Sequence, residues 1–140
     1  MALSHITDGT LVDAVDWNAL VDAINANSNY GTPDSGWVNI TVGTGYTAAT
    51  DTPQARQVGD TLRLRGTIQA SSGNLTGTAA IGTIPTSITA PTVQIVYAAA
   101  GASGGVPMRV VIGTDRSITM TAPLTGTSTY VNLTALLPLT

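Results

Sequence analysis

The sequence predicts a mainly β protein, a jelly-roll-like antiparallel sandwich preceded by one short N-terminal α-helix and assembled as a homotrimer. Three observations predict this class. Residues 1–35 contain the only segment with the 3.6-residue period of an amphipathic helix, whereas residues 36–140 alternate at period two. Roughly seven or eight such short segments, separated by Gly, Pro and polar turns, are typical of sandwiches and jelly rolls. The low content of charged and aromatic residues indicates surfaces that are buried between copies of the chain.

Composition supports one β-domain that associates with copies of itself. The 140-residue chain contains no Phe and no Cys, so its core must consist of Val, Ile, Leu and Ala without disulfide bonds. Charged residues make up 9% of the chain, against roughly 25% in ordinary soluble proteins. A surface with so few charges indicates extensive contact with other protein. A core shared around a threefold axis would strengthen a core of small residues, which predicts the trimer.

Several function classes are excluded by charge and hydropathy. The net charge is −3 and the chain has no Lys, so it offers no basic face for nucleic acid. It has no apolar run of about 18 residues that would span a membrane. The N-terminus lacks a basic region followed by a long apolar run, so the product is expected to stay in the cytoplasm where it is made.

The N-terminal part is predicted to be an arm and a helix that bind a partner. Asp13 can cap a helix over residues 14–26, which at about twelve residues is marginal alone in water. Either Trp17 packs on the chain's own β-domain, or three copies or a larger surface receive the helix. The expected partner-binding residues lie on the arm and on the apolar helix face: Leu3, His5, Ile6, Trp17, Leu20, Val21 and Ile24.

The β-domain follows a linker over residues 27–36. Period-two alternation predicts strands at Trp37–Val42, Thr61–Gln69, Ala79–Ile84, Val93–Ala98, Met108–Ile112, Ser117–Thr121 and Tyr130–Leu136. Gly59-Asp60 predicts a turn, and Thr114–Arg116 predicts a short hairpin loop.

The strand predicted at Thr61–Gln69 has a clear division of faces. Leu62, Leu64 and Ile68 share the apolar face, and the polar face carries Arg63, Arg65, Thr67 and Gln69. The two Arg residues are expected to prevent edge-to-edge pairing, or to pair with an Asp of a neighbouring subunit.

The chain is not expected to be an enzyme or to bind a cofactor. Gly101–Gly105 fits the pattern of a nucleophile elbow, but no helix pattern follows it and the only His is His5. We therefore interpret it as a Gly-rich loop. One His without Cys makes no metal site, and the Asp residues stand in turns and caps, with no Glu in the chain. No phosphate-binding or dinucleotide motif occurs.

A resemblance to a known family rests on a series of short motifs in the same order. These are Ile6–Thr10, Trp17–Leu20, Gly36–Ile40, Ala55–Gly66, Ile84-Pro85, Ala90-Pro91, Val110–Ile112, Ser117-Ile118 and Tyr130–Leu133. The series resembles a β-domain of minor structural proteins in tailed phages of actinobacteria and Gram-positive hosts. The resemblance implies a trimeric module of the virion, attached through its N-terminal part. The family often has Gly in the loop that here is Asp115–Ser117.

Two virion roles follow from the resemblance. The short segment before the β-domain favours a capsid decoration protein that binds and stabilises the shell, with the major capsid protein as partner. The alternative is a tail-fibre or head-fibre receptor-binding protein that contacts host surface glycans. Copy number per particle would distinguish them.

A glycan-binding module outside any virion would need exposed aromatic side chains, and the β-domain offers Trp37, Tyr46, Tyr97 and Tyr130.

Overall fold

A computed structural model describes residues 33–101, 107–122 and 128–139, and all the regular structure in these ranges is antiparallel β. This confirms the mainly β prediction; the helix predicted over residues 14–26 lies outside the described ranges. The strands within them are β1 (Val38–Asn39), β2 (Thr41–Val42), β3 (Tyr46–Ala48), β4 (Gln54–Val58), β5 (Thr61–Arg65), β6 (Thr67–Ala70), β7 (Thr78–Thr83), β8 (Ile95–Gly101), β9 (Pro107–Ile112), β10 (Ser117–Thr121), β11 (Tyr130–Asn132) and β12 (Ala135–Pro138).

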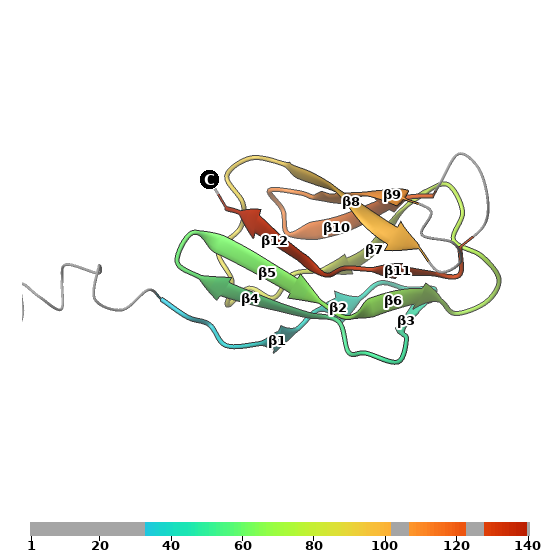
Figure 1. The fold of residues 1–140 in the computed structure, drawn as a ribbon, viewed down its shortest axis with the longest axis horizontal. Coiled ribbons are helices and arrows are strands. Elements are labelled where there is room, and N and C mark those ends of the chain that lie inside the picture. The colour runs from blue at the N-terminus through green and yellow to red at the C-terminus, as the bar shows by residue number, and fades with distance from the viewer. Residues whose placement is uncertain (1–32, 102–106, 123–127, 140) are drawn as a thin grey trace, which may run out of the picture. The chain divides into compact units, whose positions relative to one another are not determined.

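The strands form two sheets (Figure 1). The four-stranded sheet has the order β1-β4-β5-β12, and the eight-stranded sheet has the order β2-β7-β10-β9-β8-β11-β6-β3. Within the larger sheet β8, β9 and β10 follow one another as hairpins and β7 lies beside β10, which is a Greek-key arrangement. The predicted two-sheet antiparallel architecture is therefore present.

Gly66 divides the long strand predicted at Thr61–Gln69. β5 belongs to the four-stranded sheet and β6 to the eight-stranded sheet, and Gly66 between them has φ +91°. A side chain there would place Cβ 2.4 Å from the carbonyl oxygen of Thr52, so only Gly fits this bend. Thr67 was expected on the polar face, but it is buried, because the chain changes sheets immediately before it.

Two other predicted strands are divided in the same way. Trp37–Val42 becomes β1 and β2, with Ile40 between them donating its N–H to the Pro53 carbonyl at 2.9 Å. Tyr130–Leu136 becomes β11 and β12, which also lie in different sheets. In Figure 1, β11 and β12 follow each other end to end, as β5 and β6 do. These crossings connect the two sheets through the chain itself.

Aliphatic side chains from both sheets form one core. The expected Val, Ile, Leu and Ala residues are joined there by Met108 and Met120, both fully buried. Its largest buried members are Leu62, Leu64, Ile68, Ile81, Ile84, Ile88, Met108, Val110, Ile112, Ile118, Met120 and Leu133. Each buried side-chain polar atom in the described residues has a hydrogen-bond partner. The core thus forms without Phe, as composition requires.

The predicted hairpin loop between β9 and β10 is confirmed, and its turn is held by Asp115. The Oδ1 atom of Asp115 accepts hydrogen bonds from the Ser117 hydroxyl at 2.6 Å and the Ser117 N–H at 3.0 Å. Arg116 has φ +70°, the conformation that favours Gly. The side-chain bonds of Asp115 stabilise this turn in place of a Gly at its tightest point.

The end of the predicted linker already belongs to the β-domain. Pro33 accepts the N–H of Gly59, and Ser35 donates its N–H to the Gln57 carbonyl at 3.0 Å. Asp34 forms a bridge opposite Val58. These contacts attach residues 33–35 along β4.

No helix in the described ranges is long and apolar enough to cross a membrane.

Candidate functional site

The residues predicted to bind a partner and the Gly-rich loop all lie outside the described ranges or border them. Leu3, His5, Ile6, Trp17, Leu20, Val21 and Ile24 fall within residues 1–32, and Ser103 falls within residues 102–106. Their roles stay predictions. A candidate site must therefore be sought in the β-domain, and its most distinctive surface is the outer face of the four-stranded sheet.

Three of the five Arg residues lie on this face. Arg56 projects from β4 opposite Arg63 of β5, and Gln54 lies opposite Arg65. Arg63 and Arg65 were expected to prevent edge-to-edge pairing, or to pair with an Asp of a neighbouring subunit. The first expectation is wrong, because β5 is paired on both sides, by β4 and β12, and the second stays a prediction. Their exposure on an interior strand leaves these guanidinium groups available for another role.

Trp37 is the aromatic centre of the face. The guanidinium carbon of Arg65 lies 4.1 Å from the centroid of the Trp37 ring, and that of Arg56 lies 5.9 Å from it. Cations at these distances are attracted by the negative face of an indole ring. The ring is half-buried, so it has a fixed position and still reaches solvent. We call Trp37, Gln54, Arg56 and Arg65 the Trp37 cluster.

Asp34 neutralises one of the two guanidinium groups. Arg56 donates from Nε to Oδ1 of Asp34 at 2.8 Å and forms a second bond from Nη2 to Oδ2. The Arg56 bond, followed by the Gly36 N–H, lowers the pKa of Asp34 to about 2, and the charges of Arg56 and Arg63 add to the shift. The same bond raises the pKa of Arg56. Asp34 thus stays ionised across the neutral range.

Gln54 positions the other guanidinium group. Its Oε1 atom accepts bonds from Nε of Arg65 at 2.9 Å and from Nη2 at 2.5 Å. Its Nε2 atom donates to Oδ1 of Asn39 on β1 at 2.8 Å. Arg65 is therefore held by a neutral amide and an aromatic ring, and it has no ion-pair partner among the described residues.

A polar pocket opens beside Arg65. It has a volume of about 460 Å³ and is lined by Thr50, Asp51, Thr52, Gln54, Arg65, Gly66 and Thr134. Backbone bonds fix its wall, since Thr67 donates to the Asp51 carbonyl at 3.2 Å and Leu133 donates to the Gly66 carbonyl at 2.9 Å. The lining residues carry three hydroxyls, a carboxylate, an amide and a guanidinium, and the guanidinium of Arg65 also lies over the Trp37 ring. This combination can bind a polyhydroxylated molecule through hydrogen bonds.

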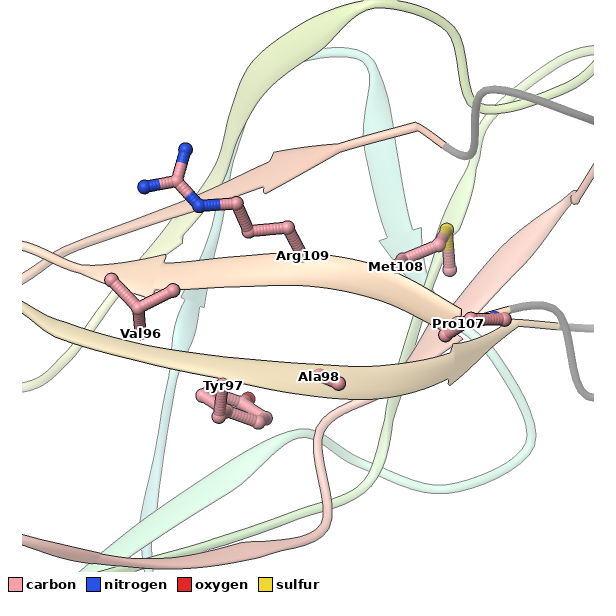
Figure 2. A pocket seen from close by; sticks show the side chains of 6 residues that line it. All are labelled: Val96, Tyr97, Ala98, Pro107, Met108 and Arg109. Carbon is pink, nitrogen blue, oxygen red and sulfur yellow. The ribbon is translucent and has the colours of Figure 1, made fainter.

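A second hollow, of about 340 Å³, lies on the outer face of β8 and β9 and is largely apolar (Figure 2). Figure 2 shows Val96 and Tyr97 on opposite sides of β8. Tyr97 lies toward the core, where burial raises the pKa of its phenol, and its hydroxyl donates to the Leu133 carbonyl at 3.4 Å. Val96 is 50% exposed. Arg109 is the one charged residue in the lining, so this hollow offers few polar contacts.

The sequence pointed to parts of this site but not to its assembly. Trp37 was named only as an available aromatic side chain, and Arg63 and Arg65 were explained otherwise. The polar pocket was missed, since its lining comes from three segments, residues 50–54, 65–66 and 134. The described residues contain no group of three or more side chains able to hold a metal ion.

Comparison with solved structures relates the fold to two phage proteins. The head domain of lactococcal phage bIL170, one of the receptor-binding domains of lactococcal phages, superposes with a TM-score of 0.60 and 18% identity, over 75% of this chain and 98% of that one. The receptor-binding protein of Listeria phage PSA superposes with a TM-score of 0.58 and 17% identity, over 94% of this chain and 86% of that one. No protein-family model matches the sequence, and no curated protein matches it. The expected likeness to phage β-domains is thus confirmed at the level of the fold.

Proposed function

We propose that this chain is a structural component of a bacteriophage particle that binds a glycan receptor on the surface of the host cell. The observation that carries the proposal is the fold, which two receptor-binding proteins of phages share over most of this chain. The polar pocket and the Trp37 cluster supply hydrogen-bonding groups and an aromatic surface of the kind that a glycan requires. The role is binding, without catalysis.

Receptor binding is better supported than capsid decoration. Decoration was favoured from the shortness of the segment before the β-domain, and receptor binding was the alternative. The two phage proteins compared above are receptor-binding proteins, which favours receptor binding. Counting copies per particle would test this choice directly, because decoration requires hundreds of copies and a tail or fibre tip only a handful.

We also propose that the chain assembles as a homotrimer and attaches to the particle through residues 1–35. The paucity of charge and the exposed apolar residues Val93 and Val96 support association of the β-domain. For attachment, Trp17→Ala should weaken loading onto stripped particles more than Trp37→Ala does, after correction for folded fraction. A chain that begins near Gly36 should fold but fail to load, and its loading to the same extent as the full chain would move the attachment surface to the β-domain.

Receptor binding can be tested with the fluorescently labelled full chain on a panel of Gram-positive cells that includes lactococci and Listeria. We expect saturable binding to at least one strain and loss of binding after periodate oxidation of surface sugars. Trp37→Ala should weaken binding at least about tenfold, which corresponds to about 1.4 kcal/mol. Tyr46→Ala is the matched aromatic control. Binding that survives both periodate and Trp37→Ala would contradict the proposal.

A further inference from the structure

We propose that the polar pocket beside Trp37 binds an acidic sugar unit, whose carboxylate or phosphate group is held by Arg65. This ligand class rests on the proposed glycan binding and narrows it to one chemistry. The pocket combines a fixed cation, a carboxylate and several hydroxyls within about 460 Å³. That volume lies within the roughly 300–1,000 Å³ usual for small-ligand sites.

Arg65 is preorganised, and some of its hydrogen-bond donors have no acceptor among the described residues. A guanidinium carries five N–H groups. Two of these donate to Gln54, and the carbon lies 4.1 Å over the Trp37 ring. The remaining donors have no protein acceptor among the described residues, where the only ion pair formed by an Arg is that of Arg56 with Asp34. A guanidinium held in one orientation by its neighbours can bind an anionic group through two parallel bonds at a low entropic cost.

The two cations over the Trp37 ring differ in charge balance. Arg56 is neutralised by Asp34, whereas the partners of Arg65 within the described part of the chain are the amide of Gln54 and the Trp37 ring. Arg63 lies exposed on the same strand as Arg65 and adds positive potential to this face. An anion approaching the Trp37 cluster is therefore attracted to Arg65.

Asp51 explains why the ligand should be an acidic sugar and not a bare anion. Asp51 lines the same pocket, together with Thr50, Thr52 and Thr134, whose side chains carry hydroxyls. A carboxylate repels a simple anion but accepts hydrogen bonds from sugar hydroxyls. A ligand with an acidic group at one end and hydroxyls at the other satisfies both charges of the pocket. A neutral sugar leaves Arg65 without an anionic partner.

The test is a titration of the full-length, ¹⁵N-labelled chain with glucose 1-phosphate, glucuronate and glucose at constant ionic strength. The indole signal of Trp37 reports binding, and a Trp17→Phe variant assigns it, since the chain has two Trp residues. We expect saturable shifts with at least one acidic sugar and an affinity for glucose at least about tenfold weaker. A response to glucose 1-phosphate alone identifies a phosphate ligand, and one to glucuronate alone a carboxylate ligand. An equal response to glucose, or no response to either acid, would overturn the proposal.

Two variants of β5 separate a fixed subsite from diffuse charge attraction. Arg65→Gln should abolish the preference for the acidic sugars, whereas Arg63→Gln, which removes the same charge from an exposed position outside the pocket, should retain it. Arg65→Lys keeps the positive charge but lacks the paired N–H donors of a guanidinium, so it should lose most of the affinity for the acidic sugars. Unchanged circular dichroism establishes that each variant is folded. An equal loss of the preference for acidic sugars in Arg63→Gln and Arg65→Gln would overturn the proposal of a fixed subsite.

The same variants distinguish failure of this subsite from failure of receptor binding. If the wild-type chain binds cells and Arg65→Gln binds them equally well, receptor binding stands and the acidic ligand is wrong. If the wild-type chain binds none of the cells, the proposed function fails, and the sugar titration still decides the chemistry of the pocket.

Discussion

Among the residues near Trp37, Gly66 tolerates substitution least. It combines φ +91° with a Cβ direction that meets the backbone of Thr52 and Pro53. Thr52 is also part of the polar pocket. A side chain at position 66 would therefore strain the crossing between the sheets and displace a wall of the pocket at the same time.

We predict that Gly66→Ala lowers the free energy of unfolding by about 3–5 kcal/mol, because conformational strain and a backbone clash add together. Gly73→Ala is the matched control, since Gly73 has φ +68° and open space around its Cβ direction. Its cost should be only about 1–2 kcal/mol. Urea denaturation of both variants measures the difference. Equal costs would show that the close approach at Thr52 has no energetic weight.

Asp34 provides a prediction about pH. Its pKa is lowered to about 2 in the folded chain, first by Arg56. A lowered carboxyl pKa means that the ion pair stabilises the fold above the ordinary value of 3.8 and that this contribution is lost as pH falls toward about 2. Arg56→Gln should raise the titration midpoint of Asp34 toward 3.8, as measured by carboxyl ¹³C NMR. The pKa of Asp115 is lowered by Ser117 and should not move. An unchanged Asp34 midpoint would contradict the assigned cause.

At the scale of the strand, β12 alternates sharply between core and solvent. Leu136 is 68% exposed and lies opposite Arg63, whereas Leu137 is 8% exposed and lies opposite Leu62. Leu137→Ala should therefore lower the free energy of unfolding by about 2–5 kcal/mol. Leu136→Ala, the same substitution one residue earlier, should change it by less than about 0.5 kcal/mol. Thermal or urea unfolding of the pair checks the register, and reversed effects would refute it.

Strands with regular alternation and clear ends were predictable, and strands that change sheets were not. β10 was predicted at its observed bounds, Ser117–Thr121, because apolar residues alternate there directly after the loop at Thr114–Arg116. β4 was missed because Gln54–Val58 has one fully buried side chain, Ala55, among polar neighbours. At Gly66 the alternation of Leu62, Leu64 and Ile68 continues in phase, so periodicity alone could not show that the chain changes sheets.

The candidate site was less predictable than the fold. The sequence shows Trp37 and the Arg residues, but the contacts that distinguish Arg56 from Arg65 depend on Asp34 and Gln54, which reach them across neighbouring strands. Such pairs follow from strand register, and β4 was not among the predicted strands. Gly66 was the one local signal, since an isolated Gly within a strand pattern often marks a bend or a close backbone approach.

For the whole molecule we predict a trimer in solution. The prediction rests on the exposed apolar residues Val93 and Val96 in a chain with only 9% charged residues. Sedimentation equilibrium at micromolar concentration should give about three times the 14.2 kDa of one chain. Val96→Asp should shift the mass toward that of the monomer if the outer face of β8 is part of the interface. A monomer at micromolar concentration would refute the trimer.

The three strand crossings at Ile40, Gly66 and Leu133 determine how the β-domain comes apart. At each crossing, one strand of the four-stranded sheet is joined directly to one strand of the eight-stranded sheet. Opening one sheet therefore disturbs the strands of the other. Local openings of the kind that release single motifs are thereby suppressed, and the domain should behave as one cooperative unit. Core amides of both sheets, such as those of Leu64 and Val110, should exchange with solvent deuterium at the same free energy. If amides of the four-stranded sheet exchanged through a separate opening of lower free energy, the crossings would not couple the unfolding of the two sheets.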